Sequence, residues 1–214
     1  SGSYDPADFL GREIGDAPWG RMAEMAMFEA YDHNFFATQF HIDMFKKVFY
    51  PIDHIKDDEK YASFMQSGHW AKFLYDRNKS RTSMIQTGWP MEYLPHTLDH
   101  YNTTKEDIVL FPHRIAPEKQ PEIFKDLAQH LPEYKFIMAQ ENTLSKTEYH
   151  KLLAKSKIVF SANTQETLGI SWYEGALLGA IPLMPDRLSY SEMMPAEAKM
   201  MSLYPSEWTD TYNN

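Results

Sequence analysis

The chain contains no cysteine among its 214 residues. That absence excludes disulfides, thiolate metal ligands and cysteine nucleophiles, and it is compatible with a reducing cytosol. The sequence also lacks an apolar run of about 18 residues and a signal-peptide pattern. We therefore expect no membrane span and a cytoplasmic location.

An excess of positive charge is lacking as well. The 21 Lys and Arg residues are outnumbered by 30 Asp and Glu residues, which gives a formal charge of -9 and a pI near 5.4. Nonspecific binding to nucleic acid or to an anionic membrane usually needs a basic stripe, so this balance argues against both, although a local basic site stays open. No H-x-x-x-H pair lies in a predicted helix and no Asp-x-Asp motif follows a predicted strand, so we expect no metal site.

The apolar content is ample for a packed core, at 43% of the residues with 14% aromatic. In the first part of the chain the apolar spacing is mostly helical. It predicts helices within 5–31, a strand over 34–38, a helix over 41–50, a helix pair within 53–77 and a strand over 82–87. We expect residues 1–95 to form a mostly helical, partial N-terminal domain, with the boundary in the connection that ends near Pro95.

The second part, 96–214, alternates regularly between strands and helices. The pattern predicts strands over 108–111, 135–139, 158–161 and 181–184, with helices over 120–131, 146–155 and 168–179 between them. Such alternation is typical of an α/β fold, a Rossmann-like parallel sheet with helices on both faces. Residues beyond 184 show little pattern, so the sheet is predicted to end there.

Two glutamates follow the third of these strands, in the segment ETLGISWYE. Glu166 and Glu174 flank Gly169, where the strand turns into a helix. Ligands of open parallel sheets bind outside the carboxyl ends of the strands, so this turn is a candidate site. With Glu166 at the turn and Glu174 about two helical turns along, the carboxylates are roughly 12 Å apart, near one helix face.

This turn also supplies backbone donors. The N–H groups of Leu168, Gly169 and Ile170 are predicted to be first-turn amides without helical partners, suited to a phosphate or an anionic leaving group. Glu166 could accept hydrogen bonds from sugar hydroxyls, and Glu174 from a ribose diol. The alternative is a capped helix with Glu166 near its positive end and Glu174 in solvent.

A second group of polar residues follows the strand over 108–111. Arg114 and Lys119 stand five residues apart, before the next helix. An arginine fork and a mobile lysine, together with a helix N-terminus, can hold a diphosphate. The alternative is a surface Arg and Lys beside Glu118.

Together these residues resemble the donor site of retaining nucleotide-sugar glycosyltransferases of family 4, which have the GT-B fold. That family has an Arg and a Lys after the first strand of its C-terminal domain, matched here by Arg114 and Lys119, and an E(x7)E motif, matched by Glu166 and Glu174. The stretches VLFPHRIAPEKQ (109–120) and GAIPLMPDRLSY (179–190) are similar to its phosphate loop and to its strand after the second glutamate. The second stretch most resembles the queuosine-tRNA mannosyltransferase group and some phage relatives.

The resemblance implies a role for each matched residue. Arg114 and Lys119 would hold the donor diphosphate, Glu166 the sugar as the catalytic residue, and Glu174 the ribose. The amides of Leu168, Gly169 and Ile170 would complete the donor site. His113 and Thr167 depart from the family, which often has glycine at those positions, and either could narrow the pocket.

The implied activity is sugar transfer with retention at the anomeric carbon, from a donor such as a UDP-sugar or GDP-sugar and without a cofactor. The implied acceptor class is a nucleic-acid base, in tRNA or modified DNA. Complete family members are longer, so the chain is expected to be a fragment or an unusually short member. The alternative function is a noncatalytic nucleotide-binding or partner-docking module derived from such an enzyme.

Overall fold

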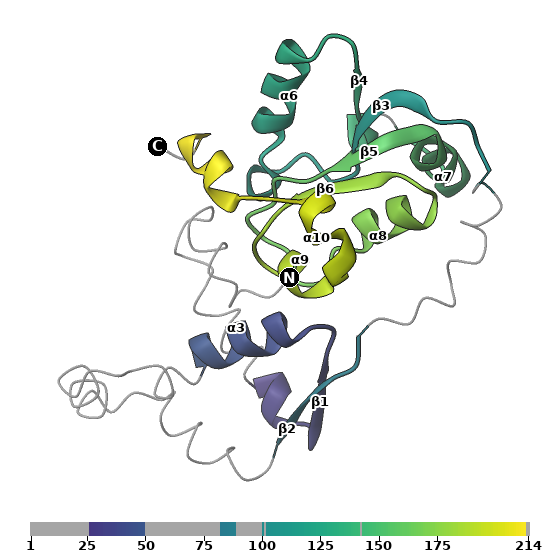
Figure 1. Cartoon of the computed structure of the whole chain (residues 1–214). Coiled ribbons are helices and arrows are strands. Elements are labelled where there is room, and N and C mark those ends of the chain that lie inside the picture. Colours follow the sequence, from purple (N-terminus) through teal and green to yellow (C-terminus); the bar gives the residue numbers. More distant parts are fainter. Residues whose placement is uncertain (1–25, 50–81, 89–99, 101, 142, 213–214) are drawn as a thin grey trace. The chain divides into compact units, whose positions relative to one another are not determined.

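The computed structural model describes residues 26–49, 82–88, 100, 102–141 and 143–212 (Figure 1). The chain divides into two compact units, Ser1–Gly88 and Trp89–Asn214. The predicted boundary near Pro95 lies outside the described residues and stays a prediction. Each unit is described by itself.

The first unit contains a small parallel sheet and a helix. Residues 26–29 are helical, and β1 (His33–Phe36), α3 (Gln39–Phe49) and β2 (Ser83–Gln86) follow. The predicted strands over 34–38 and 82–87 and the predicted helix over 41–50 are therefore confirmed to within about two residues. The helices predicted within 5–31 and 53–77 fall largely outside the described residues, so the mostly helical character of this region stays a prediction.

Two features fix this small unit. Thr38 caps α3, because its hydroxyl accepts a hydrogen bond from the amide of His41 at 3.1 Å. Phe36 of β1 packs against Phe45 of α3 with ring centroids 5.5 Å apart, and Phe45 lies 4.6 Å from the ring of Phe28. All three rings are buried and form an aromatic core between helix and sheet.

The second unit alternates strands and helices along the chain. Its elements are β3 (Glu106–Phe111), η3 (Pro117–Lys119), α6 (Pro121–His130), β4 (Lys135–Met138), η4 (Ala139–Glu141), α7 (Lys146–Lys155), β5 (Ser156–Phe160), α8 (Ile170–Leu177), β6 (Ile181–Pro185), α9 (Tyr190–Met193), α10 (Ala196–Ser202), β7 (Leu203–Tyr204) and η5 (Ser206–Tyr212). The strands form one parallel five-stranded sheet in the order β4-β3-β5-β6-β7. The predicted α/β fold with a Rossmann-like parallel sheet is confirmed at this level.

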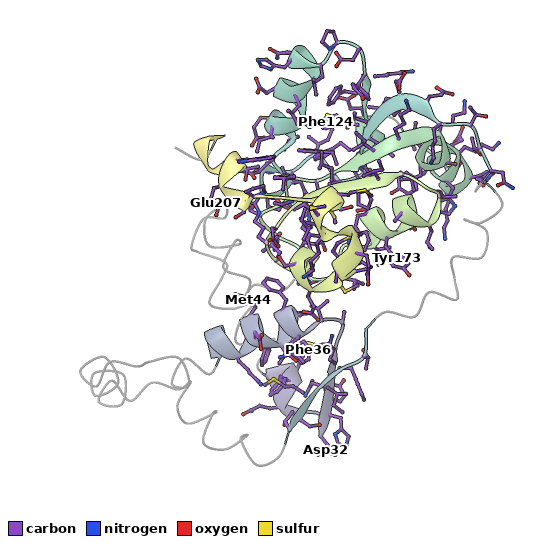
Figure 2. All side chains as sticks on the ribbon, viewed as in Figure 1. Asp32, Phe36, Met44, Phe124, Tyr173 and Glu207 are labelled. Carbon is purple, nitrogen blue, oxygen red and sulfur yellow. The ribbon has the colours of Figure 1, made fainter. Side chains whose placement is uncertain are left out.

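Helices cover both faces of this sheet, because β3 is apolar on both of its sides. Ile108 and Leu110 pack with residues of α7 and with Leu178, which follows α8, whereas Val109 and Phe111 pack with α6. Phe124 of α6, labelled in Figure 2, packs against the sheet, and its ring centroid lies 5.3 Å from that of Phe111. The helices therefore fix the sheet from both sides and leave its strand ends for a ligand.

The helix starts follow local sequence chemistry. Pro121 occupies the first turn of α6, where its missing N–H is not needed. Ser145 and Glu148 form a capping box at α7, with Ser145 Oγ accepting from the Glu148 amide at 3.2 Å. The start of α8 is different, because its N-cap is Gly169 in the left-handed region with φ +87° and no side-chain cap.

The prediction that the sheet ends near residue 184 is wrong. The chain continues through α9 and α10 into β7, which places Leu203 opposite Met184 and Tyr204 opposite Pro185. A strand of two residues is too short to show an alternation of apolar and polar residues. In α10, the apolar residue Met200 is 95% exposed, so the apolar residues of this helix do not mark a buried face. Among the residues that the structure describes, no helix is long and apolar enough to cross a membrane.

Candidate functional site

The sheet has a topological switch point between β3 and β5. The chain leaves β3 for β4 on one side and then returns to β5 on the other side of β3. Doubly wound folds bind their ligands at such a point, outside the carboxyl ends of the two strands, so the loops that follow β3 and β5 form the candidate site. Arg114, Lys119 and Glu166 lie in these two segments, whereas Glu174 lies in α8.

Lys119 joins the two loops. It ends η3, and its Nζ donates to the carbonyl oxygen of Gln165 at 2.6 Å and lies 3.5 Å from Oε2 of Glu166. The amide of Thr164 donates to the carbonyl oxygen of Glu118 at 2.9 Å, which fastens the same loops through their backbones. The side chains of Lys119 and Glu166 are 12% and 19% exposed, so both keep some access to solvent and to a ligand.

Arg114 lies in a different setting from Lys119. Its guanidinium forms an ion pair with Glu118, and its side chain is 59% exposed. The structure therefore brings Lys119 to Glu166 and leaves Arg114 at the outer part of the loop after β3. A flexible exposed arginine can still reach a phosphate, but it would have to exchange Glu118 for that ligand.

The carboxylate of Glu166 folds back onto its own loop. Its Oε1 accepts from the amides of Thr167 at 3.1 Å and Leu168 at 3.4 Å, and its Oε2 accepts from Nδ2 of Asn163 at 3.3 Å. The amide of Leu168 is thus already engaged, in contrast to the prediction that it is a free donor.

The helix after this loop begins two residues later than predicted, at Ile170. Glu166 lies in the turn before the helix, so the helical rise per residue from which its spacing to Glu174 was predicted does not apply to it. The left-handed backbone of Gly169 sets this start, since its N–H and that of Ile170 then open the first turn of α8 without a side-chain cap.

Glycine is required at 169 for two reasons. A side chain is strained at φ +87°, and a Cβ there would lie 2.7 Å from Cδ1 of Trp172 and 2.9 Å from Cε1 of Tyr190. Trp172 and Tyr190 are both buried and form the floor beneath the turn. The turn is therefore held by close packing as well as by hydrogen bonds.

Glu174 faces α7 and is buried, at 9% exposure, in contrast to the alternative that places it in solvent. Its Oε1 lies 3.9 Å from Nε2 of His150. Burial raises the pKa of Glu174, against the opposing effects of the charge of Lys146 and a hydrogen bond from Tyr149.

A pocket lies beside this glutamate. It has a volume of ≈ 440 Å³ and is lined by η4, the loop that follows and the start of α7: Ala139, Gln140, Thr143, Leu144, Lys146 and Tyr149. Since η4 directly follows β4, the pocket lies at the same carboxyl edge of the sheet as Lys119 and Glu166. Lys146 and Tyr149 both line the pocket and act on Glu174.

His113, predicted to narrow the pocket, is buried in the loop after β3. Its ring meets the edge of Phe111 with centroids 5.1 Å apart. Burial, with a smaller contribution from the charge of Lys119, lowers the pKa of His113 to about 3. The imidazole is therefore neutral at physiological pH and packs as part of the loop.

Sequence reasoning missed three residues that shape the site: Asn163, Arg187 and Tyr190. Arg187 donates to the carbonyl oxygens of Ala162 at 2.7 Å and Asn163 at 2.8 Å, and so holds the loop after β5. Their position was the signal that could have identified them. Each follows the carboxyl end of a predicted strand, and polar residues at these ends lie together at one edge of a parallel sheet.

The expected absence of a metal site stays a prediction. Within 26–49, 82–88 and the described part of 100–212, no group of three or more His, Asp and Glu side chains could hold a metal ion. Comparison with models of known protein families finds no match, and a search of curated proteins finds none either. The geometry of the site therefore has to support the functional argument.

Proposed function

We propose that the second unit is the donor-binding domain of a GT-B glycosyltransferase and that it transfers the sugar of a nucleotide-sugar donor with retention at the anomeric carbon. The observation that carries this proposal is the meeting of Lys119 and Glu166 at the switch point of the sheet, at 3.5 Å. A cation for phosphate and a carboxylate for hydroxyls are thereby presented together at one edge of the sheet.

The diphosphate is placed against Lys119 and the start of α8. The N–H groups of Gly169 and Ile170 open that helix, and its dipole favours an anion there. Arg114 adds a second cation once its exposed side chain exchanges Glu118 for phosphate. Together these groups offset much of the charge of a diphosphate.

The nucleoside is placed in the pocket lined by Gln140, Lys146 and Tyr149. Glu174 stands next to Lys146 and Tyr149, and a carboxylate there accepts hydrogen bonds from the two hydroxyls of a ribose. A buried carboxylate forms stronger hydrogen bonds than one in water, which offsets part of the cost of burying it.

The sugar is placed against Glu166, which touches the reacting part of the donor. In the transfer, the bond between the anomeric carbon and the diphosphate oxygen breaks, the acceptor oxygen or nitrogen bonds to that carbon on the same face, and the proton of the acceptor passes to the departing diphosphate. Negative charge grows on the leaving diphosphate, where Lys119 and the α8 amides stabilise it. Glu166 orients the sugar hydroxyls and stabilises positive charge near the ring.

The acceptor that we propose is a nucleic-acid base, in tRNA or modified DNA. This part of the proposal rests on the similarity of the stretch 179–190 to base-modifying glycosyltransferases. Incubation of the protein with labelled nucleotide sugar and either tRNA or modified DNA tests it. A labelled nucleic acid is the expected product, and its absence with both acceptors would contradict this acceptor class.

Calorimetric titration with UDP-, GDP- and ADP-sugars tests donor binding. Lys119→Ala is expected to weaken binding by roughly 10- to 100-fold, because a charge-assisted hydrogen bond contributes about 1.5–3 kcal/mol. Lys125→Ala is the matched control, since Lys125 is an exposed lysine on α6, outside the loops that follow β3 and β5. Absence of binding to every nucleotide sugar, or equal affinity of the two variants, would refute the assignment.

An assay of turnover separates the enzyme from a noncatalytic module. An enzyme releases nucleoside diphosphate from the donor, either by transfer or by slow hydrolysis. A module that only binds nucleotide would show the same calorimetric affinity and release none.

A further inference from the structure

Behind Glu166 lies a chain of polar groups, Ser161, Asn163 and Tyr190, which we call the polar chain. Tyr190 is fully buried, and its hydroxyl lies 2.8 Å from Oγ of Ser161 and accepts from Nδ2 of Asn163 at 2.7 Å. Asn163 is also fully buried and donates to Oε2 of Glu166 at 3.3 Å. The polar chain therefore connects the start of α9 with the carboxylate of Glu166.

The Tyr190 hydroxyl lies between Ser161 and Asn163. It accepts from Nδ2 of Asn163, and it shares with Oγ of Ser161 a hydrogen bond in which either hydroxyl can donate. Burial, and next the negative charge of Glu166, raise the pKa of Tyr190 well above its ordinary value, so the hydroxyl keeps its proton. Ser161 Oγ also accepts from the amide of Asn163 at 3.2 Å, which closes the turn.

The Glu166 carboxylate fixes the orientation of the Asn163 amide, because a carboxylate oxygen can only accept a hydrogen bond. Its nitrogen faces both Tyr190 and Glu166, while its oxygen is buried without a hydrogen-bond partner in the described part of the chain. The reversed orientation would turn Oδ1 toward Oε2 of Glu166, and two oxygens with partial or full negative charge would repel. A buried acceptor left unpaired is unfavourable, so the arrangement persists because the amide nitrogen is needed on the other side.

The backbone beneath Asn163 is held independently. Arg187 donates to the carbonyl oxygens of Ala162 and Asn163 at 2.7 and 2.8 Å, and also to Oε1 of Gln120 at 3.1 Å. With the backbone fixed, the side-chain amide of Asn163 is the adjustable part. Tyr190 holds this amide from its other side, because its hydroxyl accepts from Nδ2 at 2.7 Å.

We propose that Asn163 and Tyr190 are positioning residues that set the direction of the Glu166 carboxylate toward the donor sugar. The inference rests on the proposed function, since it assigns the carboxylate a sugar to meet. Neither residue touches the donor, because both side chains are fully buried. Their effect reaches the sugar through Glu166 alone.

Tyr190→Phe tests the inference, with Tyr204→Phe as the matched control. Tyr204 is likewise buried and its hydroxyl donates to the carbonyl oxygen of Ser161 at 2.7 Å, so it loses a comparable hydrogen bond near the same loop. Each variant is titrated with a nucleoside diphosphate and with the nucleotide sugar that the wild type binds. Tyr190→Phe is expected to weaken the sugar-dependent part of the affinity roughly 10-fold, as for a misplaced positioning group, and to leave diphosphate affinity unchanged.

A double-mutant cycle with Glu166→Gln completes the test. If Tyr190 acts through Glu166, the loss caused by Tyr190→Phe disappears in the Glu166→Gln background. If the wild type binds no nucleotide sugar, the proposed function and this inference both fail. If the wild type binds but Tyr190→Phe changes the sugar-dependent affinity no more than Tyr204→Phe, only the positioning role fails.

A variant that does not fold is detected by its thermal unfolding curve. In that case Asn163→Ala is measured by the same ratio of sugar-dependent to diphosphate affinity. It removes the donor to Glu166 directly, and a ratio equal to that of the wild type would overturn the inference.

Discussion

The ammonium group of Lys119 lies 2.6 Å from the carbonyl oxygen of Gln165, so the loop after β3 is bound to the backbone of the loop after β5. Loss of this contact removes a hydrogen bond from a buried carbonyl group and weakens the connection between the two loops. Lys119→Met is therefore expected to lower the free energy of unfolding by about 1–3 kcal/mol, which urea denaturation measures. Lys125→Met, on the exposed face of α6, should change it by less than about 0.5 kcal/mol. Equal stabilities would contradict the structural role of Lys119.

We expect the Glu174 carboxylate to lower the free energy of unfolding at neutral pH and to contribute to the binding of nucleotide sugar. Its pKa is raised in the folded protein, so the folded state binds the proton more tightly than the unfolded state. Stability from this group is therefore present at acidic pH and is lost as the pH rises above about 4.5 through the raised pKa. Glu174→Gln should be as stable as the wild type, or more stable, at pH 7, and should bind nucleotide sugar more weakly.

Denaturation at several pH values between about 4 and 8 checks this sign. Glu122→Gln, at an exposed position on α6, is the control and should leave the pH dependence unchanged. A Glu174→Gln variant that is less stable at pH 7 than at pH 4, relative to the wild type, would contradict the prediction.

His113 is expected to make the protein sensitive to acid. Burial lowers its pKa in the folded protein to about 3, whereas the unfolded chain takes up the proton near the ordinary value of 6.5. The stability that neutral His113 contributes is fully present above about pH 6.5 and is lost as the pH falls from there toward about 3. His113→Leu should therefore show a shallower loss of stability over this window, whatever its stability at pH 7.

The control for that measurement is His130→Leu, because the side chain of His130 is 71% exposed at the end of α6. His130→Leu should leave the change of stability with pH the same as in the wild type. Some acid sensitivity is expected to persist in both variants, since burial also lowers the pKa of His41 to about 4 in the first unit.

Gly169→Ala is expected to damage both stability and the site. The left-handed backbone and the approach of 2.7 Å to Trp172 act together, so a loss of more than about 2 kcal/mol is expected from urea denaturation. Gly179→Ala is the matched control, because Gly179 has a similar φ of +78° but its Cβ would meet only the end of Lys105 at 3.5 Å. Its loss should be about 1 kcal/mol, and equal losses would show that packing under Gly169 is unimportant.

Features that depend on local pattern or on strand ends could be predicted from the sequence. The helix over 146–155 is confirmed to the residue, because Ser145 and Glu148 form a capping box that marks its start. The approach of Lys119 to Glu166 follows from the rule that parallel strands end at one edge, since that rule alone brings the two loops together.

Features that depend on packing between distant elements were out of reach. Glu174 is buried because α7 lies against α8. No local sequence pattern predicts which face of α8 packs against α7. The link from Tyr190 to Glu166 passes through Asn163, so it exists only when the ends of β5 and β6 are adjacent. Strand β7 was missed because two residues carry no periodicity.

The position of β3 in the middle of the sheet also has a consequence for folding during synthesis. Of the five strands of this sheet, β3 is the first to leave the ribosome, yet Glu106 pairs with Ser156 and Ile108 with Lys135. The apolar residues of β3 are paired on both sides only after β4 and β5 have been synthesised, and contacts between distant segments form slowly. A translational pause before β5 would therefore leave Ile108 to Phe111 exposed as an incompletely paired strand, which favours aggregation during this interval.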